Sequence, residues 1–251
     1  MRQGSHSVLE SVYNPIKESK FMNFYWFGRT TENDFKELSD QLEEAGFYGT
    51  LLPYVVGIGD YFVKISRYLT VGEKLKYIVA IRPYTISPQY IKMIIKSINQ
   101  IDRGRVEINF VSGVIDEYEK DFNGIYGEIN DSSSFKERKK YLLDYLKVWN
   151  DMQATKPYVY VSGMTEEIWD AVEKYADANM FAYEHILKKN KTREINKKRV
   201  ISVCIKNIED VQKSIDEVKA LGYEDIMFYV EGPNDELRSK IINFVKEYNG
   251  L

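Results

Sequence analysis

Residues 78–113 read IVAIRPYTISPQYIKMIIKSINQIDRGRVEINFVSG, and they contain a strand, a helix and a second strand in immediate succession. The first strand is expected over residues 77–81, an apolar run that ends before Pro83. Proline has no N–H to give to a sheet, so a central strand cannot continue through it. A helix then begins, because Ser87 is a good N-cap and Pro88 suits the first helical turn.

This helix has one apolar face, since four isoleucines recur at helical spacing: Ile91, Ile94, Ile95 and Ile98. Gly104 marks a turn, and a second buried strand is expected over residues 106–111. That strand ends in Ser112 and Gly113. The stretch is therefore a strand–helix–strand unit whose strands end in polar loops.

The same alternation of buried strands and amphipathic helices continues along the chain. Eight strands are expected, over residues 23–27, 48–52, 77–81, 106–111, 158–161, 179–182, 200–205 and 226–230. Strands that alternate with helices indicate a parallel sheet, and eight such units favour a closed (β/α)8 TIM barrel over an open sheet. We expect one domain over residues 22–251, and we interpret residues 1–21 as an N-terminal extension or a cloning remnant.

Composition argues against several classes of partner. The 35 basic and 38 acidic residues give a formal net charge of −3, so no electrostatic footprint for nucleic acid or an anionic membrane is expected. No apolar run is long enough to span a bilayer. The single cysteine, Cys204, rules out an internal disulfide and fits a reducing compartment, so we expect a cytoplasmic protein. The sequence contains neither an HExxH motif nor paired Cys/His residues at metal-binding spacing, so no metal site is expected.

Four short motifs in the opening stretch carry a resemblance to a known family. They are Ala80-x-Arg82-Pro83, Ser87-Pro88, Gly104-Arg105 and Asn109-x-Val111-Ser112-Gly113. In order and spacing they resemble the bacterial luciferase-like flavin-dependent monooxygenases, most closely the alkanesulfonate monooxygenase branch. The resemblance implies a luciferase-like (β/α)8 barrel and FMN as the cofactor.

The resemblance also implies partners. Members of this family take reduced FMN from a separate NAD(P)H-dependent flavin reductase and oxidise a small organic substrate with O2. They commonly form homodimers through helices beside the early strands. In this chain, the aromatic residues expected to be exposed on those helices are Tyr61, Phe62 and Tyr90.

Active sites of (β/α)8 barrels lie on loops at the carboxyl ends of the strands. That rule alone selects seven places: Gly28 and Arg29, residues 54–59, Arg82, residues 109–113, residues 162–165, residues 183–185 and residues 202–206. The longest irregular segment, residues 114–134, also follows a strand. It is either a lid or substrate loop, or a plain surface loop.

The segment between the expected fifth strand and its helix is Ser162, Gly163, Met164 and Thr165. Exposed N–H groups and the helix dipole favour an anion at such a place. By resemblance this is the loop that holds the flavin phosphate, and Arg138 matches an arginine that also reaches it. Lys139 stands where the family has tyrosine. Alternatively, Arg138 is a solvated helix residue and Thr165 an ordinary N-cap.

Three further residues are candidates for contact with the flavin: Tyr54, Asn109 and Ser112. Alternatively, Tyr54 only caps the barrel, while the other two are strand-end polar groups satisfied by neighbouring loops. No catalytic residue is assigned, and the candidates are Tyr54, Arg82, Tyr183 and His185. Arg82 is equally suited to a structural ion pair, and His185 to a surface position beside lysines.

The chain departs from the alkanesulfonate enzymes at several positions. Ile58 stands where they have a cysteine, and Tyr183 where they have a tryptophan. Ser202 and Cys204 replace an arginine and a histidine, and the loss of that arginine argues against an alkanesulfonate substrate. Two other hypotheses stay open: a non-catalytic FMN-binding protein or partner subunit with a degenerate site, and a barrel enzyme that uses no flavin.

Overall fold

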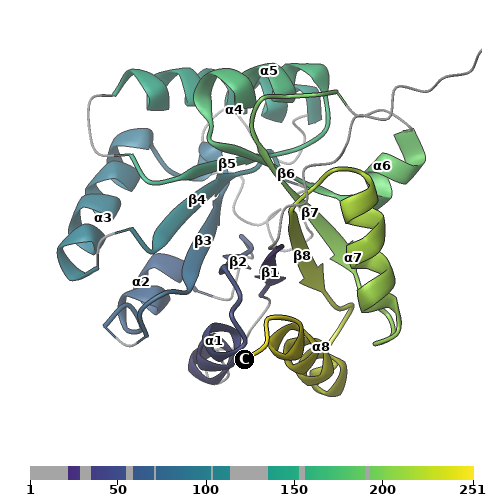
Figure 1. The fold of residues 1–251 in the computed structure, drawn as a ribbon. Helices are drawn as coiled ribbons and strands as arrows, with labels where there is room; N and C mark the ends of the chain where they lie inside the picture. The colour runs from purple at the N-terminus through teal and green to yellow at the C-terminus, as the bar shows by residue number, and fades with distance from the viewer. Residues whose placement is uncertain are drawn as a thin grey trace, which may run out of the picture.

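The computed structural model of the chain describes residues 22–28, 35–54, 59–70, 72–102, 104–113, 135–152, 156–189 and 193–251. Within them, eight parallel strands close into a barrel in the order β1-β2-β3-β4-β5-β6-β7-β8, and helices surround the strands (Figure 1). The predicted (β/α)8 barrel is thereby confirmed. The expected N-terminal extension, residues 1–21, and the long loop, residues 114–134, lie outside the described residues.

The strands are β1 Asn23–Phe27, β2 Gly49–Leu52, β3 Lys76–Ile81, β4 Val106–Phe110, β5 Val159–Ser162, β6 Ala178–Ala182, β7 Lys198–Cys204 and β8 Asp225–Tyr229. Each of them overlaps the strand expected from the sequence. The barrel closes because β1 pairs with β8, which places Asn23 opposite Asp225.

The helices are α1 Phe35–Glu44, α2 Tyr61–Ser66, α3 Pro88–Ile101, α4 Phe135–Asp151, α5 Glu166–Tyr175, α6 Tyr183–Lys189, α7 Asp210–Ala220 and α8 Asp235–Tyr248. A short 3-10 helix, η1 Pro83–Thr85, precedes α3. The predicted start of α3 is confirmed, because the Ser87 side chain accepts the N–H of Tyr90 at 3.2 Å. No helix in the described part of the chain is long and apolar enough to cross a membrane.

Two apolar layers hold the barrel together. Side chains alternate along each strand, so Met180 of β6 points into the barrel while Phe181 packs between strands and helices. The interior layer consists of Tyr25, Leu51, Ile78, Ala80, Tyr160, Ala178, Met180, Val200 and Met227. Because this layer fills the barrel, ligand chemistry is confined to its ends.

The amino-terminal end of the barrel interior contains a buried carboxylate, Glu107 of β4. One of its oxygens accepts the hydroxyl of Tyr160 at 2.7 Å, and the other accepts the hydroxyl of Tyr48 at 2.9 Å. Burial raises the pKa of Glu107, and the two tyrosine hydroxyls act in the opposite direction. The carboxylate thus links β4 to β5 and to the residue before β2.

A second buried carboxylate, Asp225, lies at the same end. Its Oδ1 accepts the Tyr25 hydroxyl at 3.0 Å and the Asn23 amide at 3.0 Å. Lys198 pairs with the same oxygen at 2.7 Å, and its ammonium also lies 5.0 Å from the centre of the Tyr48 ring. A lysine between a carboxylate and an aromatic ring is well compensated for partial burial.

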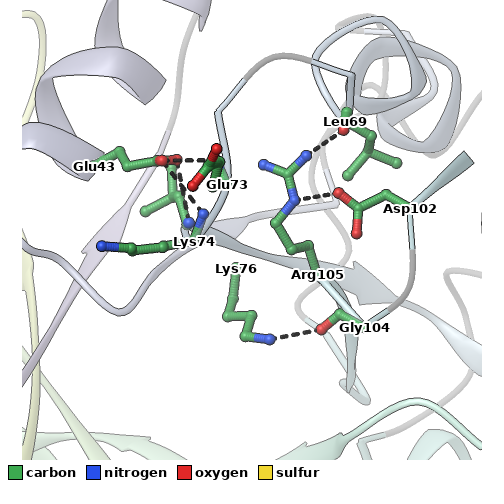
Figure 2. Close-up of polar contacts among 9 residues, drawn as sticks. Glu43, Leu69, Glu73, Lys74, Lys76, Asp102, Gly104 and Arg105 are labelled. Carbon is green, nitrogen blue, oxygen red and sulfur yellow. Dashed lines mark hydrogen bonds and ion pairs between the residues drawn. The ribbon is translucent and has the colours of Figure 1, made fainter.

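At the same end but outside the barrel interior, the carboxylate of Glu43 secures the loop that leads into β3 (Figure 2). Glu43 of α1 accepts three successive backbone N–H groups, those of Glu73, Lys74 and Leu75, at 2.7, 3.3 and 3.2 Å. Gly72 precedes them with φ +79°, and a Cβ there would lie 2.8 Å from a Glu43 oxygen. The close approach of the loop to the carboxylate therefore requires glycine.

The loop between α3 and β4 is secured in the same region (Figure 2). Arg105 is buried, pairs with Asp102 and donates to the carbonyl of Leu69, which joins this loop to the end of α2. Lys76 donates to the carbonyl of Gly104 at 2.7 Å. These contacts tie neighbouring loops together at the end of the barrel opposite the strand ends that carry active sites.

The structure corrects one expectation about the surface. Tyr61 and Phe62 are only 5% and 8% exposed, because both pack into the layer between strands and helices. Tyr90 is exposed, as expected. The large apolar side chains that α2 and α3 leave exposed also include Val63 and Met93.

Candidate functional site

The carboxyl ends of β4, β5 and β6 bring several polar or polarisable side chains together. Ser162 donates its hydroxyl to Asn109 Oδ1 at 3.0 Å, and Asn109 Nδ2 lies 3.6 Å from the sulfur of Met180. Asn109 is 1% exposed. Two residues proposed from the sequence to contact the cofactor are therefore in contact with each other, and each satisfies the other's polar group.

The loop from β5 into α5 follows directly. Gly163 has φ +137°, a conformation that side-chain-bearing residues rarely adopt, and its N–H donates to the carbonyl of Met180 at 3.1 Å. Met164 is buried, and Thr165 is the N-cap of α5, where its hydroxyl accepts the N–H of Ile168 at 3.4 Å. The capping role that was one alternative for Thr165 is confirmed.

One residue of this region was not singled out from the sequence. Asn179 of β6 is completely buried, and its Nδ2 donates to the carbonyls of Val161 at 2.8 Å and Gly163 at 3.1 Å. The signal was present in the sequence, because Asn179 is the polar residue of the otherwise apolar strand ANMFA. A buried asparagine within a strand requires specific partners, which here are the end of β5 and the loop after it.

Lys139 of α4 reaches the start of α5. Its ammonium pairs with the Glu167 carboxylate at 2.9 Å. The hydrogen bond from Lys139, with the N–H of Glu167 itself and the Thr165 hydroxyl, lowers the pKa of Glu167 to about 2. An anion at the start of α5 would therefore meet a positive and a negative side chain already paired with each other.

Arg138 takes a different direction from its neighbour. Its guanidinium donates to the carbonyl of Gly113, beyond the end of β4, at 3.4 Å. Arg82 approaches the same glycine, because a Cβ on Gly113 would lie 2.5 Å from Arg82 Nε. The two guanidinium groups therefore converge on the loop after β4, where Gly113 has φ +66°.

Arg82 also contacts the loop after β2. It is 7% exposed, and its guanidinium carbon lies 4.9 Å from the centre of the Tyr54 ring. An arginine stacked on a tyrosine in a nearly dry environment gains cation–π attraction. Ser112 is also buried close by in the chain. Arg29 and Ile58, which the sequence placed at neighbouring strand ends, lie outside the described residues.

The ends of β7 and β8 form another part of the mouth. Cys204 lies opposite Tyr229, whose ring centre is 5.9 Å from that of Phe27. Burial raises the pKa of the Cys204 thiol, and burial with the nearby thiol raises the pKa of Tyr229 to about 12. Ser202 donates to the carbonyl of Phe181 at 3.3 Å. The Ser202 hydroxyl and the Cys204 thiol, both on β7, are therefore uncharged near neutral pH.

Two catalytic candidates lie on α6. Tyr183 packs against the layer between strands and helices, and burial, together with Glu217 of α7, raises its pKa. His185 is exposed. In the described part of the chain, neither makes a hydrogen bond to Asn109 or Ser162.

The donors around the β5–α5 loop fit a phosphate group. In the described part of the chain, the N–H groups of Met164, Thr165 and Glu166 donate to no other group, and they come in succession at a helix start. Lys139 supplies a cation beside them through its pair with Glu167. By contrast, no cluster of three or more His, Cys, Asp or Glu side chains suited to a metal occurs among the residues described.

No protein-family model matches the chain. An F420-dependent secondary alcohol dehydrogenase, solved with an F420–acetone adduct, is similar with a TM-score of 0.66 at 13% identity, over 90% of this chain and 98% of that one. A long-chain alkane monooxygenase (LadA) is similar with a TM-score of 0.57 at 14% identity, over 92% and 80% of the two chains. A riboflavin lyase (RcaE), solved with modified FMN and riboflavin, is similar with a TM-score of 0.57 at 10% identity, over 79% of this chain and 66% of that one.

The chain has the luciferase-like barrel fold. The structures that share this fold include oxidoreductases and monooxygenases that use FMN or F420. The fold that the four motifs implied is thereby confirmed. At such low identity, the likeness to these proteins concerns the barrel itself.

Proposed function

We propose that the chain is an FMN-dependent monooxygenase of the two-component kind, which oxidises a small organic substrate with O2. The observation that carries this proposal is the β5–α5 loop, where successive N–H groups of a helix start lie beside a lysine at the mouth of a luciferase-like barrel. A separate NAD(P)H-dependent reductase would supply the reduced flavin, and the flavin would supply the reaction with O2.

The residues of the chain would bind and orient the flavin. The N–H groups of Met164 and Thr165 would hold the phosphate with Lys139 beside them, and Arg138 would turn from the carbonyl of Gly113 to reach it. Tyr54, Asn109 and Ser112 would border the ring, and the filled barrel interior would exclude water from beneath it. These side chains bind and position, so few acid–base groups are required of the protein.

Arg82 and Tyr54 are the catalytic candidates that remain at the strand ends, since Tyr183 packs toward α7 and His185 is exposed. A buried guanidinium favours negative charge that develops on a substrate nearby. We therefore assign Arg82 the role of electrostatic stabiliser and Tyr54 that of its ring partner.

The test is a pair of titrations, with FMN and with riboflavin, on wild type and three variants. Charged hydrogen bonds contribute about 1.5–3 kcal/mol, so Arg138→Ala should weaken FMN binding about tenfold to a hundredfold, and Lys139→Ala somewhat less. Glu167→Gln should strengthen FMN binding, because it removes the carboxylate that competes for the same place. Riboflavin has no phosphate, so its affinity should change little in all three.

Equal losses for both ligands would place the effect in the fold or in ring contacts and would refute the phosphate assignment. Unchanged affinity would leave Arg138 a structural role, through its bond to the carbonyl of Gly113. If wild type binds neither ligand in either redox form, the chain is a barrel protein without flavin.

The substituted positions on β7 favour a second candidate, a non-catalytic FMN-binding protein or partner subunit. Ser202 bonds to a backbone carbonyl, and the Cys204 thiol stays protonated at neutral pH because burial raises its pKa. Neither group is suited to proton transfer there. Tight binding of oxidised FMN without O2-dependent turnover of reduced FMN would support this candidate.

We further propose a homodimer formed through α2 and α3. An exposed apolar row runs along α3 at helical spacing through Tyr90, Met93 and Ile101, and Val63 lies exposed on the neighbouring α2. Such a row favours a partner of the same kind, a second copy of these helices.

A further inference from the structure

We propose that Asn179 is a positioning residue that holds the β5–α5 loop in the conformation in which its N–H groups face a phosphate. This role rests on the proposed function as far as the ligand is concerned. The ordering of the loop itself stands on contacts within the chain.

Strand geometry places Asn179 on the outer side of the barrel. Its neighbours Ala178 and Met180 belong to the interior layer, so Asn179 points toward the helices. It is completely buried there, directly opposite Val161 of β5. Its carboxamide is therefore held where the strand ends and the loop begins.

One amide nitrogen bridges two carbonyls that are two residues apart. Asn179 Nδ2 donates to Val161 at 2.8 Å and to Gly163 at 3.1 Å, so it spans the last residues of β5 and the first turn of the loop. Among the described residues its Oδ1 has no hydrogen-bond partner. A buried carboxamide with an unsatisfied oxygen is unfavourable, so its presence is explained by the two bonds that its nitrogen makes.

Gly163 depends on these bonds because its backbone is unusual. At φ +137° it turns the chain in a way that few residues allow, and both its N–H and its carbonyl are bound to β6, through Met180 and Asn179. Without Asn179, the carbonyl would need another donor, and rotation of the peptide to find one would redirect the N–H of Met164.

The loop is thus held from two sides. On the inner side, Ser162 bonds to Asn109 of β4; on the outer side, Gly163 bonds to Asn179 of β6. Fixed donors bind an anion better than mobile ones, because less ordering is needed on binding. Asn179 would therefore affect phosphate affinity without touching the phosphate.

The test compares Asn179→Leu with a matched control, Asn249→Leu. Asn249 is exposed, but its Nδ2 also bridges two carbonyls, those of Ala45 at 2.9 Å and Gly46 at 3.5 Å, at the opposite end of the barrel. Both substitutions remove a carboxamide that bridges two carbonyls. Only the first acts on the β5–α5 loop.

Two measurements decide the outcome. Amide hydrogen exchange without ligand should be about tenfold faster at Gly163, whose N–H donates to the carbonyl of Met180, in Asn179→Leu than in wild type, and unchanged in Asn249→Leu. FMN affinity should fall about tenfold in Asn179→Leu while riboflavin affinity changes less than about twofold. Should Asn179→Leu fail to fold, the smaller substitution Asn179→Ala also removes the donor and gives the same readout.

Unchanged exchange at the loop in the Asn179 variants would overturn the positioning role, as would equal losses of FMN and riboflavin. Failure of wild type to bind either flavin would instead refute the proposed function. The exchange measurement would then decide the positioning role alone.

Discussion

Removal of one hydroxyl from the barrel interior should destabilise the protein in a pH-dependent way. Tyr160→Phe keeps the buried ring and removes the donor that lies 2.7 Å from Glu107. The variant leaves the carboxylate with the bond from Tyr48 at 2.9 Å. Because Glu107 is 3% exposed, water is poorly placed to replace the lost donor.

The magnitude follows from the charge of the acceptor. A hydrogen bond to an ionised group contributes about 1.5–3 kcal/mol, against about 0.5–1.5 kcal/mol for a neutral pair. At about 2–4 °C per kcal/mol for a chain of this length, Tyr160→Phe should lower the melting temperature by about 3–12 °C at neutral pH.

The sign of the pH dependence follows from the pKa of Glu107, which burial raises above its ordinary value of 4.5. A carboxyl whose pKa is raised on folding binds more protons in the folded state, so its ionisation lowers stability as pH rises through that pKa. The Tyr160 hydroxyl lowers the pKa of Glu107, so its removal raises that pKa further. The destabilisation by Tyr160→Phe should therefore be largest at neutral pH and should shrink as Glu107 becomes protonated.

Urea unfolding at about pH 7.5 and about pH 5 measures both effects. Tyr158→Phe is the control, because Tyr158 lies on the same side of the sheet two residues earlier and its hydroxyl makes a long 3.4 Å bond to the backbone carbonyl of Asp177. In a Glu107→Gln background the pH dependence of Tyr160→Phe should vanish. A loss that is equal at both pH values, or equal in the control, would refute the assignment of Glu107 as an ionised acceptor.

Two other predictions concern stability and assembly. Glu43→Ala should lower the free energy of unfolding by about 2 kcal/mol, because three backbone N–H groups lose the carboxylate that accepts them. Substitution of the adjacent, exposed residue, Glu44→Ala, should change the free energy of unfolding by less than about 0.5 kcal/mol. Equal effects of the two substitutions in urea unfolding would contradict the role of Glu43. Sedimentation at micromolar concentration should give the mass of a dimer, and Met93→Glu that of a monomer, whereas a monomeric wild type would exclude the proposed interface.

The fold was predictable because its signals are local. Apolar runs bounded by proline or glycine gave the strands, and capping residues gave the helix starts at Ser87 and Thr165. The exposure of Tyr61 and Phe62 was predicted wrongly. The six-residue helix α2 is too short for its pattern to fix which side faces the core, so its packing against the barrel decided their burial.

The site was less predictable because its geometry depends on helix phase and strand orientation. Arg138 and Lys139 are adjacent in the sequence, yet successive residues of a helix point about 100° apart. Only the docking of α4 sends Lys139 to the start of α5 and Arg138 to the loop after β4. Asn179 was not predicted as a site residue for a similar reason, because its role depends on a loop that reaches it from the neighbouring strand.

The two ends of the barrel differ in how their polar groups are used. At the amino-terminal end, Glu107 and Asp225 are buried with several donors each, so a change there would act on stability. At the carboxyl end, Asn109 and Asn179 hold a loop whose Met164 and Thr165 N–H groups donate to no other group of the described chain. Donors that a chain fixes in place and leaves without an acceptor are suited to a ligand. That contrast is the physical reason to look for the cofactor at the β5–α5 loop.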